Sequence, residues 1–167
     1  THIIIPSHWN ETLDGGFLSR AQTQGIEIHR LDGLHGHVHL SPGLRKITVS
    51  DPPKVLLRLL KGDGIHDGGE VLEIPESVYD GLAITNANEG EYEGDAWGLD
   101  RELTTHDGVI TQSVTFASEA VLLGTPTLLV SKAKRGFLNR LQDDGYPLFC
   151  WDKPCLLYTS DAADEED

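Results

Sequence analysis

The feature that most constrains the fold is a series of short apolar runs separated by segments of helical length. The runs are VLLRLL at 55–60, LAIT at 82–85, GVITQS at 108–113, TLLVS at 127–131 and PLFCW at 147–151. Near-continuous apolar character is typical of strands that are buried on both faces of a parallel sheet. The alternation therefore predicts an α/β fold, a Rossmann-like parallel sheet with helices on both faces.

Helical patterns fill the intervals between these runs. Short helices are expected around 99–105 and over 136–143, and a weaker one near 70–79 is interrupted by Pro75. The helix after GVITQS is predicted to be short and largely covered, because apolar residues dominate 116–123. Gly124 and Pro126 end it.

The turn QSVT at 112–115 opens that helix at the carboxyl end of a predicted strand. In an open α/β sheet this edge faces the ligand crevice, and a helix amino terminus there offers N–H groups to an anion. Thr115 also suits an N-cap, and Glu119 suits the helix dipole without any ligand. Anion binding and plain packing are both consistent with these residues.

Composition limits the classes of protein. The chain has 27 acidic and 13 basic residues, a formal net charge of -14, and this disfavours binding to a nucleic-acid backbone. No apolar run approaches the roughly 18 residues of a membrane span, and we see no basic-then-apolar leader. We expect a cytoplasmic protein without a membrane span. Cys150, within PLFCW, is predicted to be a small core residue.

Both ends of the chain predict that it is a fragment. The chain begins with THIII, which reads as the interior of a strand, and it contains no methionine. The stretch CLLYTSDAADE at 155–165 resembles the translation of a transposase adapter used in preparing sequencing libraries. Residues 153–167 are therefore expected to be a non-native tail.

The amino-terminal part has two shorter extended runs, HIIIPS at 2–7 and IEIHRLDG at 26–33. His35, His37 and His39 follow at alternate positions, which places them on one face if the segment is a strand. Three imidazoles can bind zinc, but no cysteine or acidic partner stands at ligand spacing. We predict no metal site and no cofactor.

Three blocks resemble one family. They are IEIHRLDGLHGHVHL, VLLRLLKGDGIHDGG and GVITQSVTFASEAVLLGTPTLLVSKAKRGFLNRLQDDGY. Together they resemble the DUF354 family, whose members have a GT-B-like fold akin to glycosyltransferases and UDP-N-acetylglucosamine 2-epimerases. The resemblance implies that 1–40 is a remnant of an amino-terminal GT-B domain and its crossing segment. It makes 41–54 a linker and 55–152 the carboxyl-terminal, nucleotide-binding domain, with the missing amino-terminal domain as its partner.

The resemblance also implies nucleotide contacts. In the epimerases, a motif like S-G-G-x-Q-E-E-A-x-x-L-G-x-P binds the diphosphate at a helix amino terminus. Ser113 matches its serine, and Glu119 matches its second glutamate, which holds the ribose hydroxyls. Val114 and Thr115 replace the two glycines, so the Thr115 hydroxyl would act as a substitute donor. Ser113, Thr115 and Glu119 are the predicted nucleotide-binding residues.

Two further loops follow strands at the same edge of the predicted sheet. His66 and Asp67 lie where the epimerases have catalytic or phosphate-binding histidines, and a His beside a carboxylate can act as acid or base. The alternative is an ordinary Asp-Gly turn. Lys132, Lys134 and Arg135 are predicted to support a diphosphate, or else they form an exposed cationic loop.

These residues predict a glycosyltransferase-like domain that binds a nucleotide sugar of the uridine diphosphate type. As a fragment it is expected to be inactive, because a GT-B active site lies between two domains. A 2-epimerase-like enzyme that uses His66 is one alternative, and a non-catalytic binding or scaffold domain is another. Trp9, Trp97 and Tyr92 would stack on a base or sugar, or would belong to the core or rim.

Overall fold

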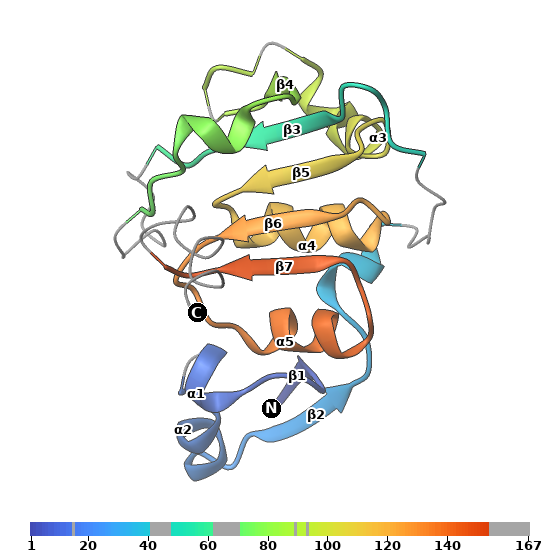
Figure 1. The fold of residues 1–167 in the computed structure, drawn as a ribbon. Helices are drawn as coiled ribbons and strands as arrows, with labels where there is room; N and C mark the ends of the chain where they lie inside the picture. The colour runs from blue at the N-terminus through green and yellow to red at the C-terminus, as the bar shows by residue number, and fades with distance from the viewer. Residues whose placement is uncertain (15, 41–47, 62–70, 89, 93, 154–167) are drawn as a thin grey trace, which may run out of the picture.

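The computed structural model describes residues 1–14, 16–40, 48–61, 71–88, 90–92 and 94–153 (Figure 1). Its elements in chain order are β1 (His2–Pro6), α1 (Glu11–Asp14), α2 (Leu18–Thr23), β2 (Glu27–Leu31), η1 (His35–Val38), β3 (Lys54–Arg58), η2 (Glu76–Tyr79), β4 (Ala83–Asn86), η3 (Ala96–Gly98), α3 (Leu99–Leu103), β5 (Gly108–Thr111), α4 (Val114–Leu122), β6 (Thr127–Val130), α5 (Gly136–Asp143) and β7 (Leu148–Trp151). The η elements are short 3₁₀ helices.

Five strands form one parallel sheet in the order β4-β3-β5-β6-β7. Counted along the chain from β3, this order is 2-1-3-4-5, a doubly wound arrangement. The predicted Rossmann-like parallel sheet is thereby confirmed. The chain moves one way from β3 to β4 and the other way from β5 onward, so right-handed crossovers place the connecting segments on opposite faces.

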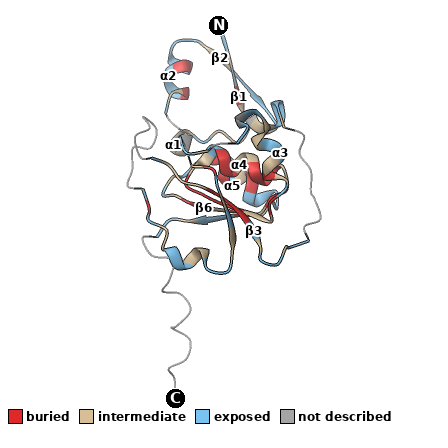
Figure 2. Cartoon of the chain, turned by 90° about the horizontal axis from the view of Figure 1, so that it is seen from above, coloured by how far each residue is buried: buried red, intermediate tan, exposed pale blue. Residues whose placement is uncertain are grey.

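The two faces of this sheet bury different residues of the same strands. Leu56 packs with residues of α3 and α4, whereas its neighbours Val55 and Leu57 pack against residues from the segment 71–82. This alternation follows the twofold period of a strand. Helices α4 and α5 pack over β6 and β7. Figure 2 shows buried residues, in red, on α4. The core is therefore layered, with the sheet between the helices and the 71–82 segment.

Helix α4 forms where the apolar pattern places it. Ser113 is its N-cap, and the Ser113 hydroxyl accepts a hydrogen bond from the Phe116 N–H at 3.4 Å. The N-cap is thus Ser113 rather than Thr115, which lies in the first turn. Gly124 ends the helix with a φ of 82°, a left-handed conformation that a residue with a side chain rarely adopts.

The predicted helix near 70–79 is much shorter. Among the described residues, only η2 forms here, and its N-cap is Pro75 with a φ of -59°. Proline has no N–H to continue a helix through this position, so the helix starts after it. The rest of the segment contributes Leu72 and Ile74 to the second face of the sheet in an extended form.

The amino-terminal unit is a second, smaller sheet. Strands β1 and β2 pair in parallel, and α1 and α2 lie in the connection between them. Figures 1 and 2 show this pair outside the larger sheet, beyond α5. Leu18 and Ala21 of α2 and Ile5 of β1 are buried. The described residues between 1 and 31 therefore form a strand-helix-strand unit, in which these three side chains are buried.

One prediction about a single residue is wrong, and the condition set for the three alternate histidines is not met. Cys150 is exposed rather than buried, because β7 is the last strand of the sheet and its Phe149–Cys150 segment faces outward. His35 and His37 belong to the 3₁₀ helix η1 and not to a strand, so they do not share a strand face with His39. Burial of Leu34 against α4 and α5 favours this compact turn.

The Tyr92 hydroxyl donates a hydrogen bond to the Glu102 carboxylate, and this bond raises the pKa of Tyr92 from 10.0 to about 12. The contribution of this hydrogen bond to the stability of the folded state is full below pH 10. It is lost as the pH rises through 12, because only the neutral phenol donates. We expect the ultraviolet titration of tyrosinate to show a late step that Tyr92→Phe removes. Burial also raises the pKa of Tyr79, so Tyr79→Phe is the matched control. A step near pH 12 that survives in Tyr92→Phe and is removed by Tyr79→Phe would contradict the assignment.

Candidate functional site

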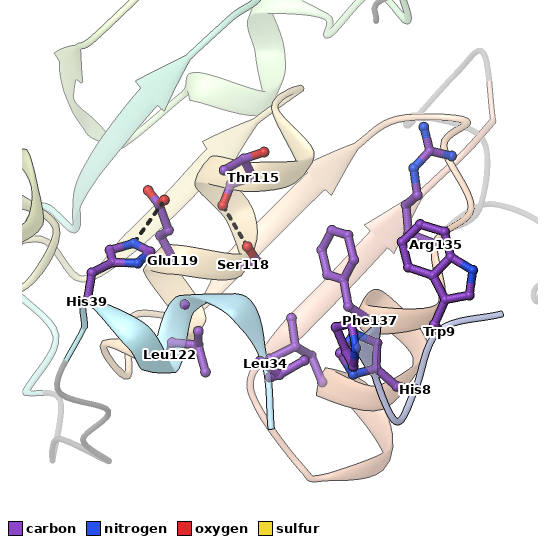
Figure 3. Close-up of a pocket in the computed structure, with 13 residues that line it drawn as sticks. His8, Trp9, Leu34, His39, Thr115, Ser118, Glu119, Leu122, Arg135 and Phe137 are labelled. Atoms are coloured by element: carbon purple, nitrogen blue, oxygen red, sulfur yellow. Dashed lines mark hydrogen bonds and ion pairs between the residues drawn. The ribbon is translucent and has the colours of Figure 1, made fainter. Parts of the chain in front are cut away.

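A pocket with a volume of about 520 Å³ lies between the amino-terminal unit and the α4–α5 layer (Figure 3). Its walls come from four parts of the chain: the loop after β1, the η1 segment, α4, and the loop that leads into α5. Two of these parts follow the carboxyl ends of β1 and β2, and two follow the carboxyl ends of β5 and β6. The ligand-facing edges of both sheets therefore meet at one pocket.

The base of the pocket is apolar. Leu34, Leu122 and Leu141 line it, and all three are buried. The ring of His8 meets Phe137 edge to face, with 6.5 Å between the ring centroids. These rings and aliphatic groups provide a surface for the flat or apolar part of a ligand.

Trp9 forms part of the same wall. Its ring packs edge to face on Phe17 with 5.2 Å between the ring centroids. The indole Nε1–H is buried and has no hydrogen-bond partner in the described part of the chain. A buried donor without a partner destabilises a protein by about 1–3 kcal/mol. A ligand or water oxygen that reached this nitrogen would remove the penalty.

The polar wall is one face of α4. Thr115 is exposed in the first turn, where helix N–H groups have no intrahelical partner. Ser118 donates from its hydroxyl to the Thr115 carbonyl at 2.7 Å. One helical turn after Thr115, the Glu119 carboxylate lies 3.6 Å from Nε2 of His39, and the two form an ion pair when His39 is protonated. Figure 3 shows His39 meeting Glu119 at one end of the pocket.

The three cations of the loop 132–135 have different surroundings, and only one of them lines the pocket. Arg135 lines the pocket and donates from its guanidinium to the Lys134 carbonyl at 2.9 Å. Lys134 instead donates to the Asp152 carboxylate at 2.8 Å, which holds the pKa of Asp152 below its usual value. Lys132 is exposed and does not line the pocket. Arg135 is the member of this loop that a ligand in the pocket can reach.

The other predicted site residues lie elsewhere. Ser113 caps α4 and does not line the pocket. His66 and Asp67 fall outside the described residues. Trp97 is 94% exposed, and Tyr92 packs beside α3, so neither belongs to the pocket wall. Of the predicted nucleotide and diphosphate residues, the structure brings together Thr115, Glu119 and Arg135.

Sequence reasoning missed several pocket residues, among them His8, Gly36 and Ser118, and considered His39 only as a metal ligand. The available signal was position: His8 follows Pro6, which ends β1, and His39 follows η1. Both segments come after the carboxyl ends of parallel strands, where ligand residues concentrate. Gly36 allows η1 to pack closely on α4, because a Cβ at this position would lie 2.4 Å from the Leu122 side chain.

Gln112 is a buried residue that holds the strand ends in place. Its carbonyl oxygen accepts from the Leu60 N–H at 2.9 Å, and its amide donates to the Leu72 carbonyl at 2.7 Å. Gln112→Leu leaves both backbone groups unpaired, so we expect the free energy of unfolding to fall by about 2–4 kcal/mol. Urea denaturation measures this. The control Gln22→Leu, at an exposed position of α2, should change stability by no more than about 0.5 kcal/mol.

Equal loss of stability in Gln112→Leu and Gln22→Leu would show that the two hydrogen bonds of Gln112 contribute nothing specific. A fall confined to Gln112→Leu would support its place as the link between the end of β3 and the segment over the second face.

Comparison with protein-family models, with curated proteins and with solved structures finds no match to the chain. The resemblance to the DUF354 family thus stays a prediction that rests on the residues quoted for it. Among the described residues, no helix combines the length and the apolar character needed to cross a membrane.

Proposed function

We propose that the pocket binds the nucleoside diphosphate part of a nucleotide sugar, in a glycosyltransferase-like domain of the GT-B type. The observation that carries this proposal is the meeting of Thr115, Glu119 and Arg135 in one pocket with Trp9. The first three were selected from two separate stretches of sequence as contacts for one ligand. A shared pocket is what a common ligand requires.

Each of these groups suits a different part of such a ligand. The Thr115 hydroxyl and the N–H groups of the first turn of α4 are donors for phosphate oxygens. Arg135 supplies a planar guanidinium, which binds phosphate through paired hydrogen bonds. The Glu119 carboxylate accepts from ribose hydroxyls. The Trp9 ring lies beside Arg135 and away from Glu119 (Figure 3), so it offers a stacking surface for the sugar beyond the diphosphate. Donors, a cation, an acceptor and an aromatic ring match the chemistry of a nucleotide sugar.

Charge makes the position of Arg135 important. The chain has a formal net charge of -14, so its average field repels a diphosphate. A local cation is needed to overcome this repulsion, and Arg135 lies at the pocket while the Lys134 charge is paired with Asp152. The pocket volume of about 520 Å³ falls within the range of about 300–1,000 Å³ that is usual for small-molecule sites.

His39 competes with a bound ribose for the Glu119 carboxylate. It pairs with Glu119 at 3.6 Å, so a ribose that binds Glu119 must either displace this imidazole or share the carboxylate with it. His39 is 46% exposed and the Glu119 side chain 32% exposed, so the pair is open to solvent and weak. An exposed ion pair of this kind can give way to a ligand at little cost.

The proposal concerns binding and not turnover. Among the described residues, the amino-terminal side of the pocket comes from the loop after β1 and the η1 segment, whereas a GT-B enzyme closes its cleft with a full second domain. Positioning of the reacting groups contributes up to roughly 7–11 kcal/mol to catalysis, and it depends on that second wall. We therefore propose the missing amino-terminal domain as the partner that makes the site catalytic.

Calorimetric titration of the tag-free chain with uridine, UMP and UDP tests the proposal. Affinity should rise along this series, because Arg135 and the α4 amino terminus act on the phosphates. Equal affinity for all three ligands would show that the phosphates make no contact and would reject the diphosphate assignment. No measurable binding of UDP at millimolar concentration would reject the pocket as a nucleotide site.

A further inference from the structure

Three metal-ligating side chains gather on the amino-terminal sheet, away from the pocket residues. They are His2 of β1 and Glu27 and His29 of β2. Nδ1 of His2 lies 2.9 Å from Nε2 of His29 and 3.2 Å from a carboxylate oxygen of Glu27. The other Glu27 oxygen lies 3.7 Å from Nε2 of His29. Within the described residues, these three form a group whose ligand atoms all lie within 4.8 Å of one another.

Strand register produces this group. His2 is paired with Glu27, and Ile4 is paired with His29, in the parallel ladder of β1 and β2. Paired residues point to the same face and residues two apart share a face, so all three side chains project on one side. Ile5, on the opposite face, is buried. The group therefore lies on the open face of a sheet whose other face is packed.

The distances fit a metal. Zinc binds imidazole nitrogen at about 2.0–2.1 Å and carboxylate oxygen at about 2.0–2.2 Å, usually with tetrahedral geometry. In a tetrahedron of that size, two ligand atoms are about 3.3 Å apart. The 2.9 Å between the two imidazole nitrogens and the 3.2 Å from His2 Nδ1 to one Glu27 oxygen are close to this value. The 3.7 Å separation joins His29 to the other Glu27 oxygen, so a rotation of the Glu27 carboxylate is needed to present one oxygen to both imidazoles. Little movement of the side chains is needed to admit an ion between them.

The donor set indicates the kind of metal. Two imidazoles and one carboxylate suit zinc and other first-row divalent ions, whereas magnesium and calcium prefer sites made of oxygen atoms. Three protein ligands leave a fourth position open to water or another group. The side chains of His2, Glu27 and His29 are 63%, 65% and 44% exposed, so an ion can reach them from solvent.

We propose that His2, Glu27 and His29 form a binding site for one zinc-class divalent ion. Such an ion joins β1 to β2 through their side chains and stabilises the small sheet that carries one wall of the pocket. The site is independent of nucleotide binding. The prediction of no metal site considered His35, His37 and His39, which lie in η1 or directly after it and do not belong to this group.

Zinc titration of the tag-free, metal-stripped chain by calorimetry, at moderate salt and with excess magnesium, tests the site. We expect one zinc per chain, and His29→Gln and Glu27→Gln should each lower the affinity at least about tenfold, because loss of even a second-shell group costs 10–100-fold. The control His37→Gln removes an exposed imidazole outside the group and should leave affinity unchanged. X-ray absorption of the zinc complex should show nitrogen and oxygen neighbours only.

Two outcomes would overturn the site: equal zinc affinity in the wild-type chain and His29→Gln, or a loss in His37→Gln that matches the loss in His29→Gln. Because the three side chains are exposed, the variants should keep the wild-type melting temperature without metal. The zinc-dependent rise in melting temperature should occur in the wild-type chain and His37→Gln and shrink in the other two variants. A rise of the same size in all four chains would also contradict the proposal.

Discussion

Leu56→Ala is expected to lower the free energy of unfolding by about 2–5 kcal/mol, the largest stability effect of any single change considered for this chain. Leu56 lies in β3, next to the centre of the sheet, and is 0% exposed. It packs against Leu103, Val109 and Phe116 from three different elements. Removal of its side chain leaves a cavity that the rigid sheet cannot close, so both burial and contact are lost.

Chemical denaturation of Leu56→Ala and of the control Leu31→Ala measures this effect. Leu31 is 58% exposed at the end of β2, so the same truncation there should change stability by less than about 1 kcal/mol. A loss in Leu56→Ala no larger than that in Leu31→Ala would mean that β3 is not an interior strand of a packed sheet.

The second large effect concerns the ligand. Arg135→Met should lower affinity for UDP by about 10–100-fold, since hydrogen bonds to charged groups contribute about 1.5–3 kcal/mol. Methionine keeps much of the length of the side chain and removes its charge. The matched control is Lys134→Met, the adjacent cation, which pairs with Asp152 and does not line the pocket. Calorimetry with UDP at fixed ionic strength compares the three chains.

Glu119→Ala completes this comparison. It should weaken both UDP and uridine, because the carboxylate is assigned to the ribose, whereas Arg135→Met should weaken UDP alone. Equal UDP affinity in the wild-type chain and Arg135→Met, or an equal loss in Lys134→Met, would remove Arg135 from the diphosphate site.

The local sequence pattern was sufficient to predict most strands and helices of the larger sheet. The run GVITQS, the helix closed by Gly124 and the run TLLVS appear as β5, α4 and β6, since each is coded by neighbouring residues. Helix α5 begins and ends where the pattern places it, at 136 and 143. The helix expected near 70–79 failed, because apolar spacing alone did not outweigh Pro75.

The pocket depended on information that no local pattern holds. Trp9 and His39 line one pocket with α4 only because segments far apart in the sequence come together, and local pattern does not predict which loops will face each other. The same is true of His2 and His29, whose contact follows from the register of β1 on β2. Cys150 illustrates the limit for burial: an apolar run predicts a strand but not whether that strand lies at the edge.

A crystal structure of the tag-free chain with UDP tests the central claim, that the pocket between the two sheets is the nucleotide site, most directly. We predict the diphosphate between Arg135 and the first turn of α4, and the ribose hydroxyls on Glu119. The contradictory result is UDP bound at the ends of β3 and β5, beside Ser113 and Gln112, with the pocket lined by Trp9 and Arg135 empty.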